Sequence, residues 1–294
     1  ETTANEIDLS FAGEYVGENA TVTYGGVILG SGVVNNGKLI ADLTKAGKTG
    51  EITLEIVSKK NDVYYTFGYN VLLVTKIIRT ADDMAAVRIT TDQLNAYTPI
   101  EGYYVLGNDI DFGGTQLSID VANTLSKQPS NFWNQSQGFR GTFDGLNHKI
   151  TNVKVGQGGI FGFVGQGAII KNVDFEDVSY AGAYGGSLFG YSVINATVQN
   201  VNIKVSSYTD CSIDQKSQGL LGARYVSGCN FINVTIDVGT CDVYSLFGRE
   251  IKVNSYSNVE IKVKSYTMFG YEGAGVNTAD KTVPPANLKV TIVA

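Results

Sequence analysis

Residues 188–204 have the sequence Leu-Phe-Gly-Tyr-Ser-Val-Ile-Asn-Ala-Thr-Val-Gln-Asn-Val-Asn-Ile-Lys, which contains the pattern that decides the fold. In each copy of the pattern, a glycine is followed some residues later by an asparagine that opens a short strand. In every copy but the first, two apolar residues directly precede the glycine. The pattern occurs six times, at intervals of 21 to 32 residues between glycines. The glycines are Gly141, Gly162, Gly190, Gly222, Gly248 and Gly270, and the asparagines are Asn152, Asn172, Asn200, Asn233, Asn258 and Asn287. Such periodic self-similarity indicates a repeat architecture.

Stacking the six copies aligns apolar residues in columns. The residue before each later glycine is Phe161, Phe189, Leu221, Phe247 or Phe269, whereas the first copy has Arg140. One position after each asparagine stand Val153, Val173, Val201, Val234, Val259 and Leu288, and three positions after it stand Val155, Phe175, Ile203, Ile236, Ile261 and Val290. Columns of this kind fill an interior when equivalent residues lie about 4.8 Å apart on neighbouring parallel strands. The pattern therefore predicts a parallel β-helix over residues 77–294.

The polar columns support the same stacking. Four positions after the asparagines stand Gly156, Glu176, Lys204, Asp237, Lys262 and Thr291, and the charged members alternate in sign. Opposite charges on adjacent strands attract, so we expect Glu176 to pair with Lys204. We interpret the asparagine column as a ladder of side-chain amides that bond to one another at a corner of the stack.

Residues 1–76 lack the repeat. Short runs of alternating apolar and polar residues, separated by glycine-containing turns, predict six or seven strands and hence an antiparallel β-sandwich that looks like the immunoglobulin-like modules of bacterial surface proteins. A small barrel is the alternative. After this segment, Thr80, Asp82 and Asp83 predict the start of a short helix, with Met84, Val87 and Leu94 on its apolar face, which would cap the open end of the strand stack.

Composition excludes several classes of function. The net charge is −6 and the pI about 4.9, without a basic cluster, so we expect neither nucleic acid nor an anionic membrane surface as a partner. No apolar run approaches 18 residues, so we expect no membrane insertion.

The polar start Glu-Thr-Thr-Ala-Asn-Glu resembles the segment that follows a removed signal peptide, which predicts a secreted or cell-surface protein. We expect a monomer without a cofactor. Cys211, Cys229 and Cys241 are expected to be buried thiols, with one disulfide as the alternative.

The sequence around the first repeats resembles the GLUG-repeat proteins of bacterial cell surfaces. The matching segments are Gly102–Leu106, Asn108–Asp111, Phe139–Ile150 and Gly159–Gly162, and the resemblance covers residues 78 to 294. It implies an exported β-helical surface domain without established catalytic residues. A metallopeptidase found beside such repeats would need a His-Glu-x-x-His helix, and this chain has the single histidine His148.

Candidate binding residues lie in the insertions between repeats. These insertions leave one corner of a stacked fold, and the binding face of a solenoid is often built in this way. An exposed tyrosine ring has an apolar plane and a polar tip, which suit a sugar or a protein partner. The predicted ligand-binding residues are Tyr180, Tyr184, Tyr208, Tyr244 and Tyr266, together with Trp133 in the polar insertion. The alternative is that these rings pack the loops against the stack.

Other polar groups have a structural interpretation. We expect His148 to be a turn residue, Asp144 to form an Asx-turn, and Asn108, Asp109 and Asp111 to form a strand-end turn rather than a calcium site. We predict no metal and no catalytic residue.

The leading hypothesis is therefore a non-catalytic surface module that binds host or extracellular-matrix glycan or protein. The alternatives are a polysaccharide lyase or glycoside hydrolase that uses the acidic group Asp174, Glu176 and Asp177, and a structural stalk without a ligand.

Overall fold

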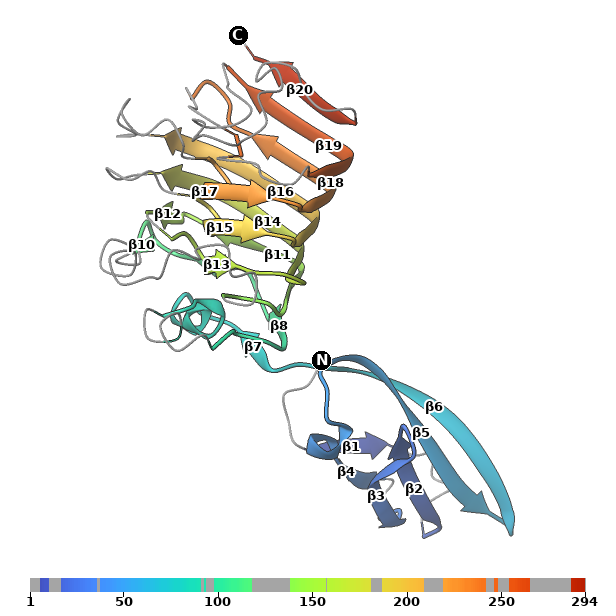
Figure 1. The fold of residues 1–294 in the computed structure, drawn as a ribbon. Coiled ribbons are helices and arrows are strands. Elements are labelled where there is room, and N and C mark those ends of the chain that lie inside the picture. The colour runs from blue at the N-terminus through green and yellow to red at the C-terminus, as the bar shows by residue number, and fades with distance from the viewer. Residues whose placement is uncertain are drawn as a thin grey trace. The chain divides into compact units, whose positions relative to one another are not determined.

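The computed structural model describes residues 6–10, 17–35, 38–90, 93, 98–117, 138–156, 158–180, 187–208, 219–241, 246–247, 254–264 and 287–293. These residues are all-β apart from short helical turns. The chain divides into two compact units, Glu1–Ile77 and Ile78–Ala294, and the colours of Figure 1 follow the residue number along the chain.

The first unit is antiparallel. Its larger sheet has the order β3 (Val27–Val33), β2 (Asn19–Tyr24), β5 (Gly50–Lys60) and β6 (Val63–Leu73), and its smaller sheet pairs β1 (Glu6–Ser10) with β4 (Lys38–Asp42), which leads into the 3-10 helix η2 (Leu43–Ala46). Burial alternates along β5, as a strand with one face on a core requires. Leu39 and Ala41 of β4 share a core with Val22 and Leu54 of the larger sheet, so the two sheets enclose one interior.

The second unit is built mainly from parallel strands. An 11-stranded sheet has the principal order β20-β19-β18-β16-β14-β11-β8-β7, and a 3-stranded sheet has the order β13-β15-β17. The strand bounds are β7 (Lys76–Ile78), β8 (Tyr103–Leu106), β9 (Ile110–Asp111), β10 (Gln116–Leu117), β11 (Thr142–Thr151), β12 (Lys154–Val155), β13 (Gly162–Val164), β14 (Ile169–Tyr180), β15 (Gly190–Ile194), β16 (Thr197–Tyr208), β17 (Gly222–Ser227), β18 (Asn230–Asp237), β19 (Ser255–Val263) and β20 (Leu288–Ile292). From β13 to β18 the chain alternates between the two sheets, which lie face to face in Figure 1.

The strand register confirms the predicted apolar columns from the second copy onward. Val173, Val201 and Val234 are register partners on β14, β16 and β18, and the column continues through Val259 and Leu288. All five are buried, with at most 6% of their surface exposed. Each buried aliphatic side chain stabilises the fold by about 1.5 to 3 kcal/mol, so these columns supply much of the stability of the second unit.

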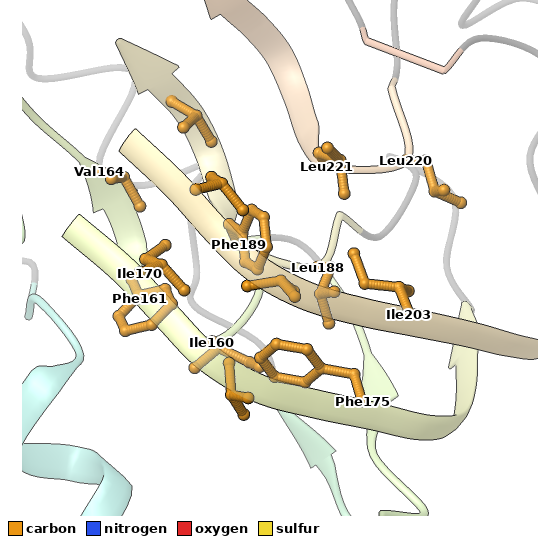
Figure 2. Close-up of a cluster of buried hydrophobic side chains, with 14 of the residues drawn as sticks. Ile160, Phe161, Val164, Ile170, Phe175, Leu188, Phe189, Ile203, Leu220 and Leu221 are labelled. Atoms are coloured by element: carbon orange, nitrogen blue, oxygen red, sulfur yellow. The ribbon is translucent and has the colours of Figure 1, made fainter. Parts of the chain in front are cut away.

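The other wall of this core is formed by residues that precede repeat glycines, among them Phe161, Phe189 and Leu221 (Figure 2). The Phe161 and Phe189 rings lie 6.3 Å apart, and Phe189 also meets Phe175 of the larger sheet at 5.9 Å. The glycine that follows is required by close backbone approach, because a Cβ on Gly190 would lie 2.7 Å from the Gly162 carbonyl oxygen. The Leu/Ile-Phe-Gly motif thus combines an inward ring with a position where two backbones touch.

The first copy of the repeat was aligned wrongly from the sequence. The Gly141 carbonyl accepts from Ile169 N–H, so Gly141 lies at the start of β11 and not in the Gly162 column. Phe139, rather than Arg140, stacks beside Phe161, at 5.0 Å between ring centroids.

The asparagine of the first copy was misplaced for a related reason. His148 pairs with Val173 in register, which places Asn147 rather than Asn152 beside Asn172. A turn at Leu146 and Asn147, both with positive φ, interrupts β11 and shifts every later position. Val153 and Val155 are buried as predicted, but Val155 pairs with Tyr180 instead of Phe175.

The predicted capping helix is a 3-10 helix, η3 (Asp82–Val87). Asp83 N–H donates to Thr80 Oγ1 at 3.2 Å, and Thr80 N–H donates back to the Asp83 carboxylate at 3.1 Å. Met84 and Val87 are buried in the same core as Phe139 and Phe161, so the helix covers part of that core.

The cysteines are thiols where the structure describes them. Cys229 is buried and Cys241 is partly exposed, and neither is in a disulfide, whereas Cys211 lies outside the described residues.

Candidate functional site

Tyr180 does not lie on a binding face. Its ring is fully buried, and its hydroxyl donates to the Leu220 carbonyl at 3.1 Å. The reason is a β-bulge at Asp177, which has a φ of 53° and shifts the alternation of β14, so that Val178 and Tyr180 point inward instead of Asp177 and Ser179. The prediction for Tyr180 is therefore wrong. Tyr184, Tyr244, Tyr266 and Trp133 lie outside the described residues, as does the side chain of Tyr208, whose backbone ends β16.

The asparagine column forms the predicted amide ladder from Asn172 to Asn258, whereas Asn152 donates to Asp111 instead. Asn200 Nδ2 donates to Asn172 Oδ1 at 2.9 Å, and Asn233 Nδ2 donates to Asn200 Oδ1 at 2.9 Å. Asn258 continues the ladder by donating to Asn233 at 3.0 Å. Each bond joins adjacent parallel strands, so the ladder reinforces the sheet from β14 to β19.

These asparagines have a left-handed backbone. The φ angles of Asn172, Asn200, Asn233 and Asn258 lie between 52° and 54°. Asparagine tolerates this conformation better than other residues with a side chain. Each strand consequently bends at its asparagine, and because the bends coincide in register, the outer surface of the sheet is hollowed along one line.

The hollow is a groove of about 440 Å³ that crosses β11, β14, β16, β18 and β19. Its lining consists of Asn147, Asn172, Asp174, Asn200, Asn202, Asn233, Thr235, Asn258 and Glu260. The ladder supplies one side, and the residues two positions after each asparagine supply the other. Asn202 in this second column donates to Asp174 Oδ1 at 2.7 Å. The polar residues two positions after each asparagine can be read from the sequence, whereas the concavity cannot.

A second hollow of about 660 Å³ lies beside the groove, between β19 and β20, and is lined in part by Glu260, which the two hollows share, and by Lys289. Lys289 Nζ lies 2.8 Å from Glu260 Oε1, and this ammonium group lowers the pKa of Glu260. Charged groups therefore stand at the β20 end of the groove.

The expected pairing of Glu176 with Lys204 is wrong. Glu176 binds Lys149 of β11 instead, at 2.8 Å, because the bulge after Phe175 moves it out of register with Lys204. The later members of that column follow the prediction, since Asp237 is the register partner of Lys204 on one side and of Lys262 on the other.

Asp144 ends the ladder in β11 and was predicted only as an Asx-turn residue. Its Oδ1 accepts from Leu146 N–H at 3.0 Å, which confirms that turn, and from Asn172 Nδ2 at 3.0 Å. Its Oδ2 accepts from the Tyr103 hydroxyl at 2.7 Å and lies 3.2 Å from Lys171 Nζ. Burial by itself would raise the pKa of Asp144, but these donors and the ammonium group hold it below its ordinary value. Both carboxylate oxygens of Asp144 are thus occupied by contacts within the protein.

The turn at residues 108–111 is also held by internal contacts. Asp109 Oδ1 accepts from Lys149 N–H at 3.0 Å and lies 3.1 Å from His148 Nδ1. Asp111 Oδ1 accepts from Gly113 N–H at 2.7 Å and Asn152 Nδ2 at 3.0 Å. Within the described ranges, no three His, Cys, Asp or Glu side chains gather as a metal ion would require. Nor does any helix among these residues have the length and hydropathy of a membrane span.

Comparison with protein-family models, with curated proteins and with solved structures finds no match for this chain.

Proposed function

We propose that this chain is a non-catalytic surface module of an exported protein, similar to the GLUG-repeat proteins, and that it binds an extended ligand in the polar groove. In this proposal, residues 77–294 form a parallel β-helix and residues 1–76 an immunoglobulin-like sandwich that acts as a spacer. The groove takes the place of the tyrosine face, since Tyr180 is buried.

Two features support the finer architecture. In the second unit the chain passes from β14 to β15, returns to β16, and repeats this through β17 and β18, as a winding chain does. In the first unit two antiparallel sheets share one core, which is the arrangement of a sandwich.

The observation that carries the binding function is the groove itself. It is open, continuous over five adjacent strands, and lined by amides, carboxylates and a hydroxyl. A solenoid offers extended surfaces of this kind to long ligands.

The spacing of the carboxylates favours binding over hydrolysis. Asp174 and Glu260 are the two carboxylates that line the groove, and they stand on β14 and β19, three strand spacings apart in the sheet. Three spacings correspond to about 14 Å, whereas an inverting glycosidase needs about 6.5 to 9.5 Å and a retaining one about 5 Å. Asp177 and Glu176, the other acidic candidates, do not line the groove.

A glycan and extracellular-matrix array tests the proposal. The wild-type chain should bind at least one class of ligand, and the double variant Asp174→Ala/Asn202→Ala should lose that binding. Lys204→Ala is the matched control, because Lys204 is exposed on the same strand as Asn202 but lies outside the groove lining. The stalk hypothesis predicts no binding to any ligand on the array. Turnover of a pectin, alginate or glycosaminoglycan substrate that Asp174→Ala abolishes would refute the non-catalytic assignment.

A further inference from the structure

We infer that the groove binds a linear, uncharged glycan that lies across the strands, with its long axis along the stacking direction. This inference rests on the proposed binding function and names its ligand class. Three properties of the groove carry it: the repeat distance, the unused hydrogen-bonding capacity of the ladder, and the charge of the lining.

The ladder repeats at the spacing of the strands, about 4.8 Å. This distance is close to the advance of an extended polysaccharide per pyranose ring. A glycan aligned with the stack would therefore present one sugar to each strand, so that the same contacts recur along the groove. A peptide in an extended conformation joins a sheet through its edge, whereas this groove runs across the face of the sheet.

The ladder amides keep free hydrogen-bonding positions. A side-chain amide has two N–H donors and two acceptor lone pairs. Asn200 uses one donor toward Asn172 and one lone pair toward Asn233, and Asn233 is bonded in the same way between Asn200 and Asn258. One donor and one acceptor position remain on each amide, and both asparagines are exposed. A sugar hydroxyl both donates and accepts, so it matches this pair of positions.

The charge of the lining selects against acidic polymers. Of the nine described residues that line the groove, Asp174 and Glu260 are acidic and none is basic. The Asp174 carboxylate would accept hydrogen bonds from hydroxyl groups but would repel uronates and sulfated sugars, whereas Glu260 is already paired with Lys289. The lining also has no aromatic or aliphatic side chain, which argues against an apolar peptide.

The number of strands sets the length of the preferred ligand. The groove crosses five strands, from β11 to β19, and thus spans about 19 Å. Affinity should rise with each added sugar until about five are bound and should then level off.

Calorimetric titration of the full chain with oligosaccharides tests the inference. The probes are neutral gluco-, manno- and xylo-oligosaccharides from disaccharide to heptasaccharide, with oligogalacturonates of the same lengths as the charged series. We expect at least one neutral series to bind with the stated length dependence, and the charged series to bind about tenfold more weakly or not at all.

Thr235→Arg provides the site-specific variant, because Thr235 lies in the middle of the groove, beside Asn202 and Glu260, and an arginine there would fill it. Affinity should fall about tenfold or more. Thr66→Arg on β6 of the first unit is the control for the added charge, and should bind like the wild type. Circular dichroism and unfolding curves establish that both variants fold.

The outcomes separate this inference from the proposed function. Stronger binding of the oligogalacturonates, an affinity independent of chain length, or wild-type affinity in Thr235→Arg would overturn the glycan assignment. Binding of a matrix protein on the array without binding of any oligosaccharide would also overturn it, yet would leave the proposed function standing. A complete absence of binding on the array would remove both.

Discussion

Replacing Asn200 by alanine would remove two ladder hydrogen bonds and leave a residue other than asparagine or glycine at a φ of 52°. A non-glycine residue in the left-handed region costs about 1 to 2 kcal/mol, and each exposed hydrogen bond contributes about 0.5 to 1.5 kcal/mol. Because the bonds are exposed, we expect their contributions near the low end. The free energy of unfolding of the second unit should therefore decrease by about 2 to 3 kcal/mol.

Two further variants separate the backbone contribution from the ladder contribution. Asn200→Gly loses the same hydrogen bonds without the steric cost, so it should be destabilised by about 1 kcal/mol less than Asn200→Ala. Asn195 has nearly the same φ, 50°, but its side chain forms no hydrogen bond within the described part of the chain. Asn195→Ala should thus cost only the backbone contribution, about 1 kcal/mol.

The assay is urea unfolding followed by far-UV circular dichroism. Leu54→Ala, in the core of the first unit, identifies which part of the curve belongs to that unit. If Asn200→Ala and Asn195→Ala were destabilised equally, the ladder would contribute nothing measurable, and the reasoning about the amides would be refuted.

Three other predictions concern the core, the glycine column and the Asp144 cluster. Phe189→Ala, at a fully buried ring between Phe161 and Phe175, should lower the free energy of unfolding by about 3 to 5 kcal/mol in urea titrations, and a loss below 1 kcal/mol would contradict the shared core. Gly190→Ala places a Cβ against the Gly162 backbone and should lower the free energy of unfolding by about 1 to 3 kcal/mol or more. Faster hydrogen exchange of the backbone amides in β13 and β15 would detect this change. The pKa of Asp144 is lowered in the folded state, so the ionised carboxylate stabilises the fold above the unfolded pKa of 3.8, and this stabilisation is lost as the pH falls through the folded pKa. The free energy of unfolding of the wild type should therefore converge toward that of Asp144→Asn in acid. Parallel pH profiles of the two proteins would exclude a contribution of Asp144 ionisation to stability.

Residues could be placed correctly from the sequence where a strand keeps a regular register, and could not where the register is interrupted. Val173, Val201 and Val234 could be placed beside one another because a valine that directly follows an asparagine marks the same point on each strand. The first copy failed because Leu146 and Asn147 form a turn inside β11, and spacing alone does not reveal such an insertion. Tyr180 failed for the same kind of reason, since one bulged residue reverses the face of everything that follows it.

The groove escaped prediction because concavity is a property of the backbone. A column of polar residues is visible in the sequence, but whether it lies on a ridge or in a hollow depends on the bend at each asparagine. The positive φ of these asparagines is the cause of the bend. Repeated Asn-Val pairs at the same point of successive strands are therefore a signal for both a ladder and a hollow beside it.

The ladder connects the stability of the second unit to its proposed binding function. In a stacked repeat each strand is stabilised mainly by its two neighbours, so an interaction that crosses strands acts on the interfaces that hold the stack together. The amides of Asn200 and Asn233 form such interactions within the protein and still have positions available for a ligand. A glycan that contacts five adjacent strands would add further links in the same direction, and its binding free energy would appear as stabilisation of the folded stack. Short oligosaccharides that contact one or two strands would bind without this effect, because they would leave most interfaces unchanged.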